Sequence, residues 1–205
     1  PTWEGLRADY GEMTVSVTEG RARYENPGLH FKDQVRSMLF SAFLDRVLGP
    51  PTNDVYMVAR NDALGGPLAQ LMKSIEPPTE WFDRSLRGVS LWLGPAGTLT
   101  RLHHDGTNNL LCQVLGRKSI QLISPLAVEI GETAEGYYAW ARPDAFESEV
   151  HSVTLEEGDA VFLPVGWWHE VASLSPSLSL ALVGFNRPNG FDYRAGRSRA
   201  APPKG

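Results

Sequence analysis

The chain has 205 residues, 42% of them hydrophobic and 21% charged, with a formal net charge of −5 and a single cysteine. This length excludes two domains of ordinary size, and the negative charge argues against nucleic acid as a partner, because no overall basic field would attract it. One cysteine excludes an intrachain disulfide and favours the cytoplasm, while the lack of a signal peptide and of any apolar run near about 20 residues argues against a membrane protein.

The first third of the chain predicts short helices around one strand. The helices are predicted from capping residues and from the helical spacing of apolar residues, over residues 3–10, 35–48 and 68–75. Thr2 would begin the first helix, and Pro67 would begin the last. A half-buried strand is expected between the first two helices, because Met13, Val15 and Val17 alternate with polar residues.

From about residue 86 onward the chain predicts short strands separated by Gly, Pro, Asn and Asp. The candidates are residues 89–93, 98–103, 109–115, 118–123, 150–155, 160–163, 169–174 and 178–185. The step 115–118, Leu-Gly-Arg-Lys, predicts a tight hairpin. So many short strands predict a mainly β fold, a barrel or jelly roll, flanked by the N-terminal helices. We expect a single domain over residues 1–190, with its barrel core at 86–185.

Two segments do not follow this pattern of short strands separated by turns. Residues 126–149 form a long connection with several aromatic side chains, which is typical of a lid or a binding loop. Residues 191–205 mix basic residues with Gly, Ala, Ser and Pro, so we expect a disordered basic tail. Because the first residue is Pro1 and not methionine, we expect the natural chain to begin further upstream.

The residues with the clearest chemistry are His103, Asp105 and His169. Residues i and i+2 of a strand point to the same face, so His103 and Asp105 can converge on one ion. His104 would point the other way, as a supporting or surface residue. His169 follows a predicted strand and fits a neighbouring position in a barrel. Two histidines and one carboxylate form the facial triad of non-haem Fe(II) oxygenases, although Mn, Ni, Co or Zn can occupy such a site.

Several segments carry a resemblance to a known family. They are residues 93–105, which end in Leu-His-His-Asp, 109–125, and 158–171, which contain Pro-Val-Gly-Trp-Trp-His. Their pattern resembles the metal-binding and neighbouring strands of JmjC-domain (cupin-8) oxygenases over about residues 86–185. It is similar to the small peptidyl hydroxylases of arginyl and asparaginyl type, and a tRNA hydroxylase shares the motifs. The resemblance implies a double-stranded β-helix, the cupin fold, with Fe(II) and the cosubstrate 2-oxoglutarate.

Position by position, the resemblance assigns the metal to His103, Asp105 and His169, which makes them the catalytic residues. It assigns the far carboxylate of 2-oxoglutarate to Lys118. Further residues that the resemblance places around the cosubstrate are Thr100, Asn109, Tyr56 and the aromatic Trp92.

Lys118 is also chemically reasonable from the residues alone. A dicarboxylate bound to a metal at one end needs a cation at the other, and a lysine supplies a compact charge. The alternative is an exposed lysine at the hairpin. Thr100 would face away from His103 on a regular strand, because their separation is odd, so we expect a bulge related to Gly97 to turn it inward.

The chain departs from the family pattern in two places. Residues 182–184 are Leu-Val-Gly where members of the family often have aromatic residues, which is expected to change the shape of the substrate pocket. The connection 126–149 is shorter than in relatives, so contacts with the substrate are not carried over.

The predicted function is an Fe(II)- and 2-oxoglutarate-dependent dioxygenase that hydroxylates a side chain of a peptide or protein, as a cytoplasmic monomer. One alternative changes the substrate: a small-molecule or RNA hydroxylase, or an N-methyl demethylase. Another is a metal-binding cupin without 2-oxoglutarate activity. Lys118 separates this last class from the others, because only an enzyme that binds 2-oxoglutarate needs its charge.

Overall fold

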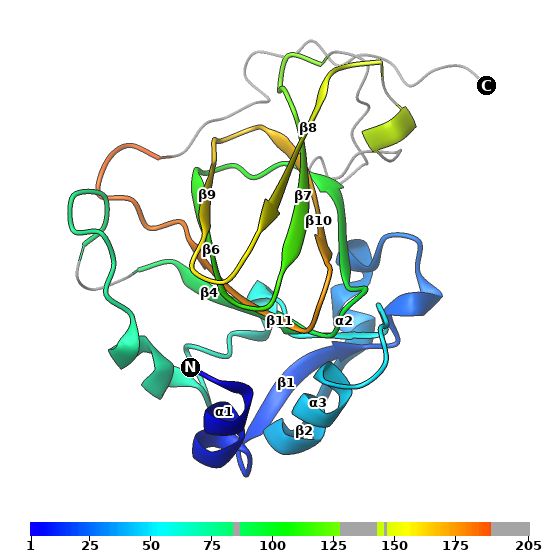
Figure 1. Ribbon diagram of the computed structural model, residues 1–205, viewed down its shortest axis with the longest axis vertical. Coiled ribbons are helices and arrows are strands. Elements are labelled where there is room, and N and C mark those ends of the chain that lie inside the picture. Colours follow the sequence, from blue (N-terminus) through cyan, green and yellow to red (C-terminus); the bar gives the residue numbers. More distant parts are fainter. Residues whose placement is uncertain (84–86, 128–142, 146, 190–205) are drawn as a thin grey trace.

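The computed structural model describes residues 1–83, 87–127, 143–145 and 147–189 (Figure 1). Its helices are α1 (Trp3–Tyr10), α2 (Phe31–Gln34) and α3 (Phe40–Val47), with 3-10 helices η1 (Arg21–Arg23), η2 (Pro27–His30), η3 (Ala59–Asn61), η4 (Ala69–Ser74) and η5 (Pro143–Ala145). Its strands are β1 (Thr14–Glu19), β2 (Val35–Leu39), β3 (Val55–Tyr56), β4 (Val89–Gly94), β5 (Leu99–His103), β6 (Asn109–Leu115), β7 (Lys118–Ile123), β8 (Val150–Leu155), β9 (Ala160–Leu163), β10 (Trp168–Ser173) and β11 (Ser177–Leu182). Among these described residues, no helix is both long and apolar enough to cross a membrane.

The N-terminal segment forms a small sheet with helices packed beside it. α1 begins at the predicted cap, because the Thr2 hydroxyl accepts a hydrogen bond from the Gly5 amide at 3.0 Å. β1 places Val15 and Val17 in the core, as their alternation predicts. β1 is the central strand of this sheet, between β2 and β3.

The helix expected over residues 35–48 is wrong in its first half. Residues Val35–Leu39 form β2, which pairs antiparallel with β1 and sets Met38 opposite Val15, and α3 begins only at Phe40. The backbone of β2 exchanges hydrogen bonds with β1, an alternative that the spacing of apolar side chains does not reveal. The short helix expected over residues 68–75 is the 3-10 helix η4.

The strands from β4 onward form a jelly roll of two facing sheets, which confirms the predicted mainly β fold. One four-stranded sheet has the order β5-β10-β7-β8, and the other has the order β4-β11-β6-β9. All neighbouring strands in both sheets are antiparallel. In Figure 1 the barrel occupies the upper part of the molecule, and α1, α3 and β1 lie below it.

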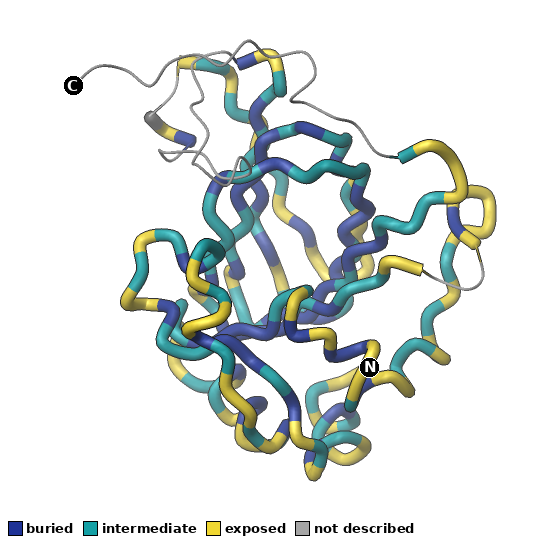
Figure 2. Tube along the Cα trace, turned by 180° about the vertical axis from the view of Figure 1, so that it is seen from behind, coloured by how far each residue is buried: buried dark blue, intermediate teal, exposed yellow. Residues whose placement is uncertain are grey.

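The core has two main layers, visible as buried segments of the trace in Figure 2. A cluster between the two sheets consists of Leu111, Leu163 and Ala181 from one sheet and Ile120 and Leu155 from the other. A larger cluster joins the outer face of the β4–β11 sheet to the N-terminal elements and includes Phe40, Phe43, Leu44, Leu91 and Leu93. The N-terminal segment is therefore packed onto the barrel, where β3 can contribute to its interior.

The predicted hairpin at residues 115–118 does not exist. β6 pairs with β11 and β9, whereas β7 pairs with β10 and β8, so the chain crosses from one sheet to the other at Gly116. Gly116 has a φ of +72°, and a Cβ atom there would lie 1.9 Å from the carbonyl oxygen of Pro176. Gly116 makes a sharp turn, as the local residues predict, but the partner of each strand is decided elsewhere in the chain.

Substitution of this glycine is expected to destabilise the protein. In Gly116→Ala, the left-handed backbone costs about 1–3 kcal/mol, and the clash with Pro176 adds about 1–3 kcal/mol. Gly158→Ala is the matched control, because Gly158 also has a positive φ, +92°, but has open space around its Cβ position. Urea unfolding of both variants should show the larger loss for Gly116→Ala, and equal losses would contradict the steric argument.

Candidate active site

The three candidate metal ligands meet at the ends of two paired strands. His103 ends β5, Asp105 lies two residues further along the chain, and His169 lies in β10 opposite His103. One ligand atom from each of the three lies within 4.8 Å of the others. His104 is not one of the three clustered ligands; it is buried against the Trp168 ring, with centroids 4.7 Å apart, it also lines the cavity, and it is not a surface residue.

Each histidine is held by a backbone carbonyl two residues before it. His103 Nδ1 lies 2.8 Å from the Arg101 carbonyl oxygen, and His169 Nδ1 lies 3.0 Å from that of Trp167. Because a carbonyl oxygen only accepts, Nδ1–H donates in both rings, and the lone pair of each neutral ring is on Nε2. His169 Nε2 lies 3.8 Å from Asp105 Oδ2. This arrangement resembles the outer hydrogen bonds that orient metal-bound histidines.

The electrostatics favour the protonation states that bind a metal. Burial, followed by repulsion from His169, lowers the pKa of His103 to about 4. Burial raises the pKa of Asp105, but attraction to His169 and His103, with a hydrogen bond from Asn109, holds it below its ordinary value. A neutral imidazole and an ionised carboxylate are the forms that coordinate a cation, so few protons need to be displaced near neutral pH.

Lys118 lies in the barrel interior and not at an exposed turn. It is only 1% exposed, and its Nζ donates a hydrogen bond to the Tyr56 hydroxyl at 3.1 Å. Among the described residues, no carboxylate lies within ion-pair distance of Lys118. A buried ammonium with a neutral partner is unfavourable unless an anion joins it.

These groups line one cavity of about 400 Å³ between the two sheets and the N-terminal segment. It brings together every residue that the sequence singled out for metal or cosubstrate: His103, Asp105, His169, Lys118, Thr100, Asn109, Tyr56 and Trp92. The Tyr56 and Trp92 rings pack with centroids 5.8 Å apart and form part of the wall. The cavity therefore joins a candidate metal site to a buried cation.

A bulge turns Thr100 toward the cavity, but not where it was expected. In the β5–β10 ladder His103 faces His169 while Thr100 faces Val171, so β5 has one extra residue between Thr100 and His103. Gly97, with φ +84°, belongs to the preceding turn against Thr52 and is not part of this bulge. The irregularity lets two residues of odd separation line the same cavity.

Asn109, in β6, braces the candidate metal ligand. Its Nδ2 donates to Asp105 Oδ2 at 3.4 Å, so the amide nitrogen points at the carboxylate. The contact indicates that Asn109 helps to hold the Asp105 carboxylate in place.

Three arginines of the cavity were not predicted from the sequence. Arg21, Arg60 and Arg101 all line it, together with η2 and α2 of the N-terminal segment. Arg101 lies in the β5 bulge, so its position could have been inferred only by locating the bulge. Arg21 and Arg60 belong to 3-10 segments, for which the sequence has no periodic signal.

Two departures from the family pattern lie in the C-terminal part. Leu182 packs with Phe82 and Leu110 and is not among the residues that line the cavity. Most of the connection 126–149 and the tail 191–205 lie outside the described residues.

Comparisons with known proteins agree with this fold. A family model described as a cupin-like domain matches residues 2–186. The chain is 34% identical over 194 residues to lysine-specific demethylase JMJ30 of Arabidopsis thaliana, covering 86% of this chain and 44% of that protein. It is also 34% identical over 106 residues to Jumonji C domain-containing protein 5 of Drosophila melanogaster, covering 45% of this chain and 26% of that protein.

A solved structure shares the fold. It is YcfD, a ribosomal oxygenase from Escherichia coli in complex with cobalt and 2-oxoglutarate, with a TM-score of 0.50 at 18% identity, over 95% of this chain and 45% of that one. The chain spans less than half the length of these relatives.

Proposed function

The chain belongs to the cupin-like domain (cupin-8, JmjC-type) family, and from this premise we propose that it is an Fe(II)- and 2-oxoglutarate-dependent oxygenase. The observation that carries the proposal is that the His103, Asp105 and His169 set and the buried Lys118 line the same cavity. A metal-binding cupin without 2-oxoglutarate chemistry has no use for a buried cation that lacks an acidic partner.

The donor set fits the metal that the family implies. Two neutral imidazoles and one carboxylate favour Fe(II) and leave coordination positions open. When bound, the iron and 2-oxoglutarate would supply the O2 activation that oxidises a C–H bond.

The residues of this chain would hold and orient these groups. His103, Asp105 and His169 would bind the metal, with Asn109 holding the carboxylate. Lys118 and the Tyr56 hydroxyl would bind the far carboxylate of 2-oxoglutarate, because both can donate to it. Thr100 would add a donor from the bulged strand.

We further propose that the substrate is a peptide or protein side chain that becomes hydroxylated. Support comes from two relatives, one named as a lysine-specific demethylase and one as a ribosomal oxygenase. Demethylation of an N-methyl group remains the second candidate, because it begins with hydroxylation of the methyl carbon. We also propose a monomer in the cytoplasm, where a lone thiol stays reduced. Burial raises the pKa of the half-buried Cys112, which disfavours its thiolate form.

The oxygenase proposal predicts measurable turnover of 2-oxoglutarate. Protein reloaded with Fe(II) and supplied with 2-oxoglutarate in air should form succinate, even slowly without the substrate, whereas protein reloaded with Zn(II) should not. Anaerobic addition of 2-oxoglutarate to the Fe(II) protein should produce a weak visible absorption band. No band and no succinate would contradict the proposal. With a substrate in hand, mass spectrometry separates the candidates: hydroxylation adds an oxygen atom, and demethylation removes a methyl group.

A further inference from the structure

The cavity is cationic although the chain as a whole has a net charge of −5. Arg21, Arg60, Arg101 and Lys118 line it, and Asp105 is the only carboxylate among the described residues of its wall. The carboxylate of Asp105 would coordinate a bound metal. The free part of the cavity is therefore suited to an anionic group.

Two of the four cations already have other functions in this geometry. Lys118 contacts Tyr56 at the end assigned to the cosubstrate. Arg21 is 4% exposed, donates to the Leu99 carbonyl at 2.9 Å and lies over the Tyr56 ring at 5.1 Å, so it supports the wall. Arg101 and Arg60 remain as contacts for a substrate.

Arg101 is the better placed of the two. Its carbonyl oxygen accepts the hydrogen bond from His103, so its backbone adjoins the candidate metal centre. Its side chain is only 13% exposed, and its guanidinium lies 3.3 Å from one oxygen of Glu25, whose side chain is 85% exposed. An ion pair with so exposed a partner contributes little stability. A carboxylate of the substrate can therefore replace the Glu25 carboxylate on Arg101.

Arg60 stands at an apolar rim formed by η2 and α2. Its guanidinium lies 5.6 Å from the centre of the Phe31 ring, and its side chain is exposed. Gln34 holds this rim in place, because its Nε2 donates to the Pro27 carbonyl at 2.9 Å. An apolar rim beside two arginines suits a peptide better than a phosphate backbone, which needs an extended basic surface.

We propose, resting on the proposed function, that the substrate is a peptide segment that presents an aspartate or glutamate side chain to Arg101, with Arg60 at the rim. An arginine binds a carboxylate through two parallel hydrogen bonds, and the low exposure of Arg101 strengthens them. The same charge repels lysine, methylated lysine or arginine side chains, which keep their positive charge. Glu25 competes for Arg101 and leaves it when the substrate binds.

The test measures peptide binding and does not depend on turnover. Protein loaded with Mn(II) and 2-oxoglutarate is titrated into fluorescent heptapeptide pools whose uncharged flanks are random and whose central residue is Asp, Asn or Lys. Anisotropy should show at least about tenfold tighter binding of the Asp pool than of either other pool, since hydrogen bonds to charged groups have about that effect.

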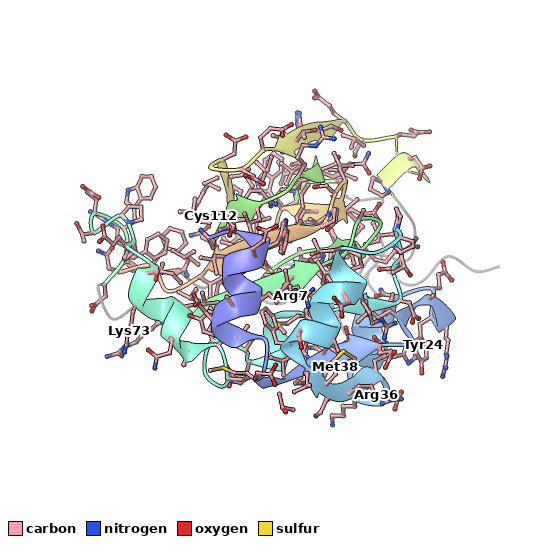
Figure 3. All side chains as sticks on the ribbon, turned by 60° about the horizontal axis from the view of Figure 1, so that its bottom comes forward. Arg7, Tyr24, Arg36, Met38, Lys73 and Cys112 are labelled. Atoms are coloured by element: carbon pink, nitrogen blue, oxygen red, sulfur yellow. The ribbon has the colours of Figure 1, made fainter. Side chains whose placement is uncertain are left out.

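Matched variants locate the effect. Arg101→Gln should remove most of the preference for Asp, and Arg101→Lys should keep part of it, because the charge remains without the paired hydrogen bonds. Glu25→Gln should tighten binding of the Asp pool several-fold by removing the competitor. Arg36→Gln is the charge-matched control, because Arg36 lies exposed on β2, outside the cavity (Figure 3), and should leave binding unchanged.

The outcomes separate the two proposals. Equal binding of the pools, a preference for the Lys pool, or tighter binding of a single-stranded RNA oligonucleotide than of the Asp pool would overturn acidic recognition. A parallel calorimetric titration with 2-oxoglutarate tests the oxygenase proposal independently. Preference for Asp without 2-oxoglutarate binding would overturn that proposal alone, whereas 2-oxoglutarate binding without the preference would overturn only the inference about the substrate.

Discussion

Replacing Asp105 with asparagine is expected to weaken divalent-metal binding by at least about 100-fold and to abolish succinate formation. Loss of a hydrogen bond that merely orients a ligand already costs about 10- to 100-fold in metal affinity, and Asp105 is itself a proposed ligand. Asparagine keeps the shape of the side chain but has no charge to attract the cation. Co(II) titration followed by absorbance, with metal content measured after dialysis, gives a readout that does not depend on turnover.

The control for this variant is His151→Gln. His151 is a potential ligand of the same kind as His103, but it lies exposed on β8 and outside the cavity. Its replacement should leave metal affinity and succinate formation at the level of the unmodified protein. If Asp105→Asn binds Co(II) as tightly as the unmodified protein does, with an unchanged melting temperature, the metal centre lies elsewhere.

Replacing Lys118 with methionine is expected to separate stability from ligand binding. Removing one partner of a buried charge pair costs about 2–5 kcal/mol of binding, which is roughly 30-fold to several thousand-fold in 2-oxoglutarate affinity. The free energy of unfolding should be unchanged or higher without the ligand, because Lys118 is 1% exposed and methionine removes a buried charge. If Lys118 served packing alone, Lys118→Met would lower the free energy of unfolding and leave the affinity for 2-oxoglutarate unchanged.

Calorimetry on the Mn(II)-loaded protein measures the affinity, and urea unfolding measures the stability. Lys73→Met is the matched control, since Lys73 lies exposed on η4 (Figure 3) and should leave the affinity unchanged. Tyr56→Phe removes the hydroxyl that accepts from Lys118 and is expected to weaken 2-oxoglutarate binding less than Lys118→Met. Unchanged affinity in Lys118→Met would shift the assignment to a cupin that does not use 2-oxoglutarate.

The positive charge of the cavity underlies both the cosubstrate and the substrate proposals. In these proposals the buried Lys118 binds an anionic group of the cosubstrate, and Arg101 exchanges Glu25 for a carboxylate of the substrate. Both anions enter a cavity whose single carboxylate among the described wall residues is assigned to the metal. Although the net charge of the protein is −5, four cationic side chains line the cavity where both anions are proposed to bind.

Local sequence signals predicted the barrel strands well. β6, β7, β8 and β9 begin and end at the predicted residues, because apolar residues recur within each segment and Gly, Pro, Asn or Asp residues punctuate the chain between them. The first half of the helix expected over residues 35–48 is wrong because pairing with a distant strand leaves no local signal in the sequence. The spacing of its apolar residues fits a helix, but the backbone of Val35–Leu39 pairs with β1.

The sequence by itself determined the chemistry of the candidate site. Two histidines and a carboxylate indicate a metal, since ligand type depends on side-chain identity and the His103–Asp105 pairing on strand period, and the resemblance to JmjC-domain oxygenases added the dicarboxylate and Lys118. Only the tertiary structure decided the rest. Pairing between distant strands placed His169 opposite His103, created the bulge that turns Thr100 inward, and sent β6 and β7 to different sheets. Packing of the N-terminal segment onto the barrel brought Tyr56, Arg21 and Arg60 to the cavity. Contacts between residues so far apart in the chain leave no local pattern in the sequence.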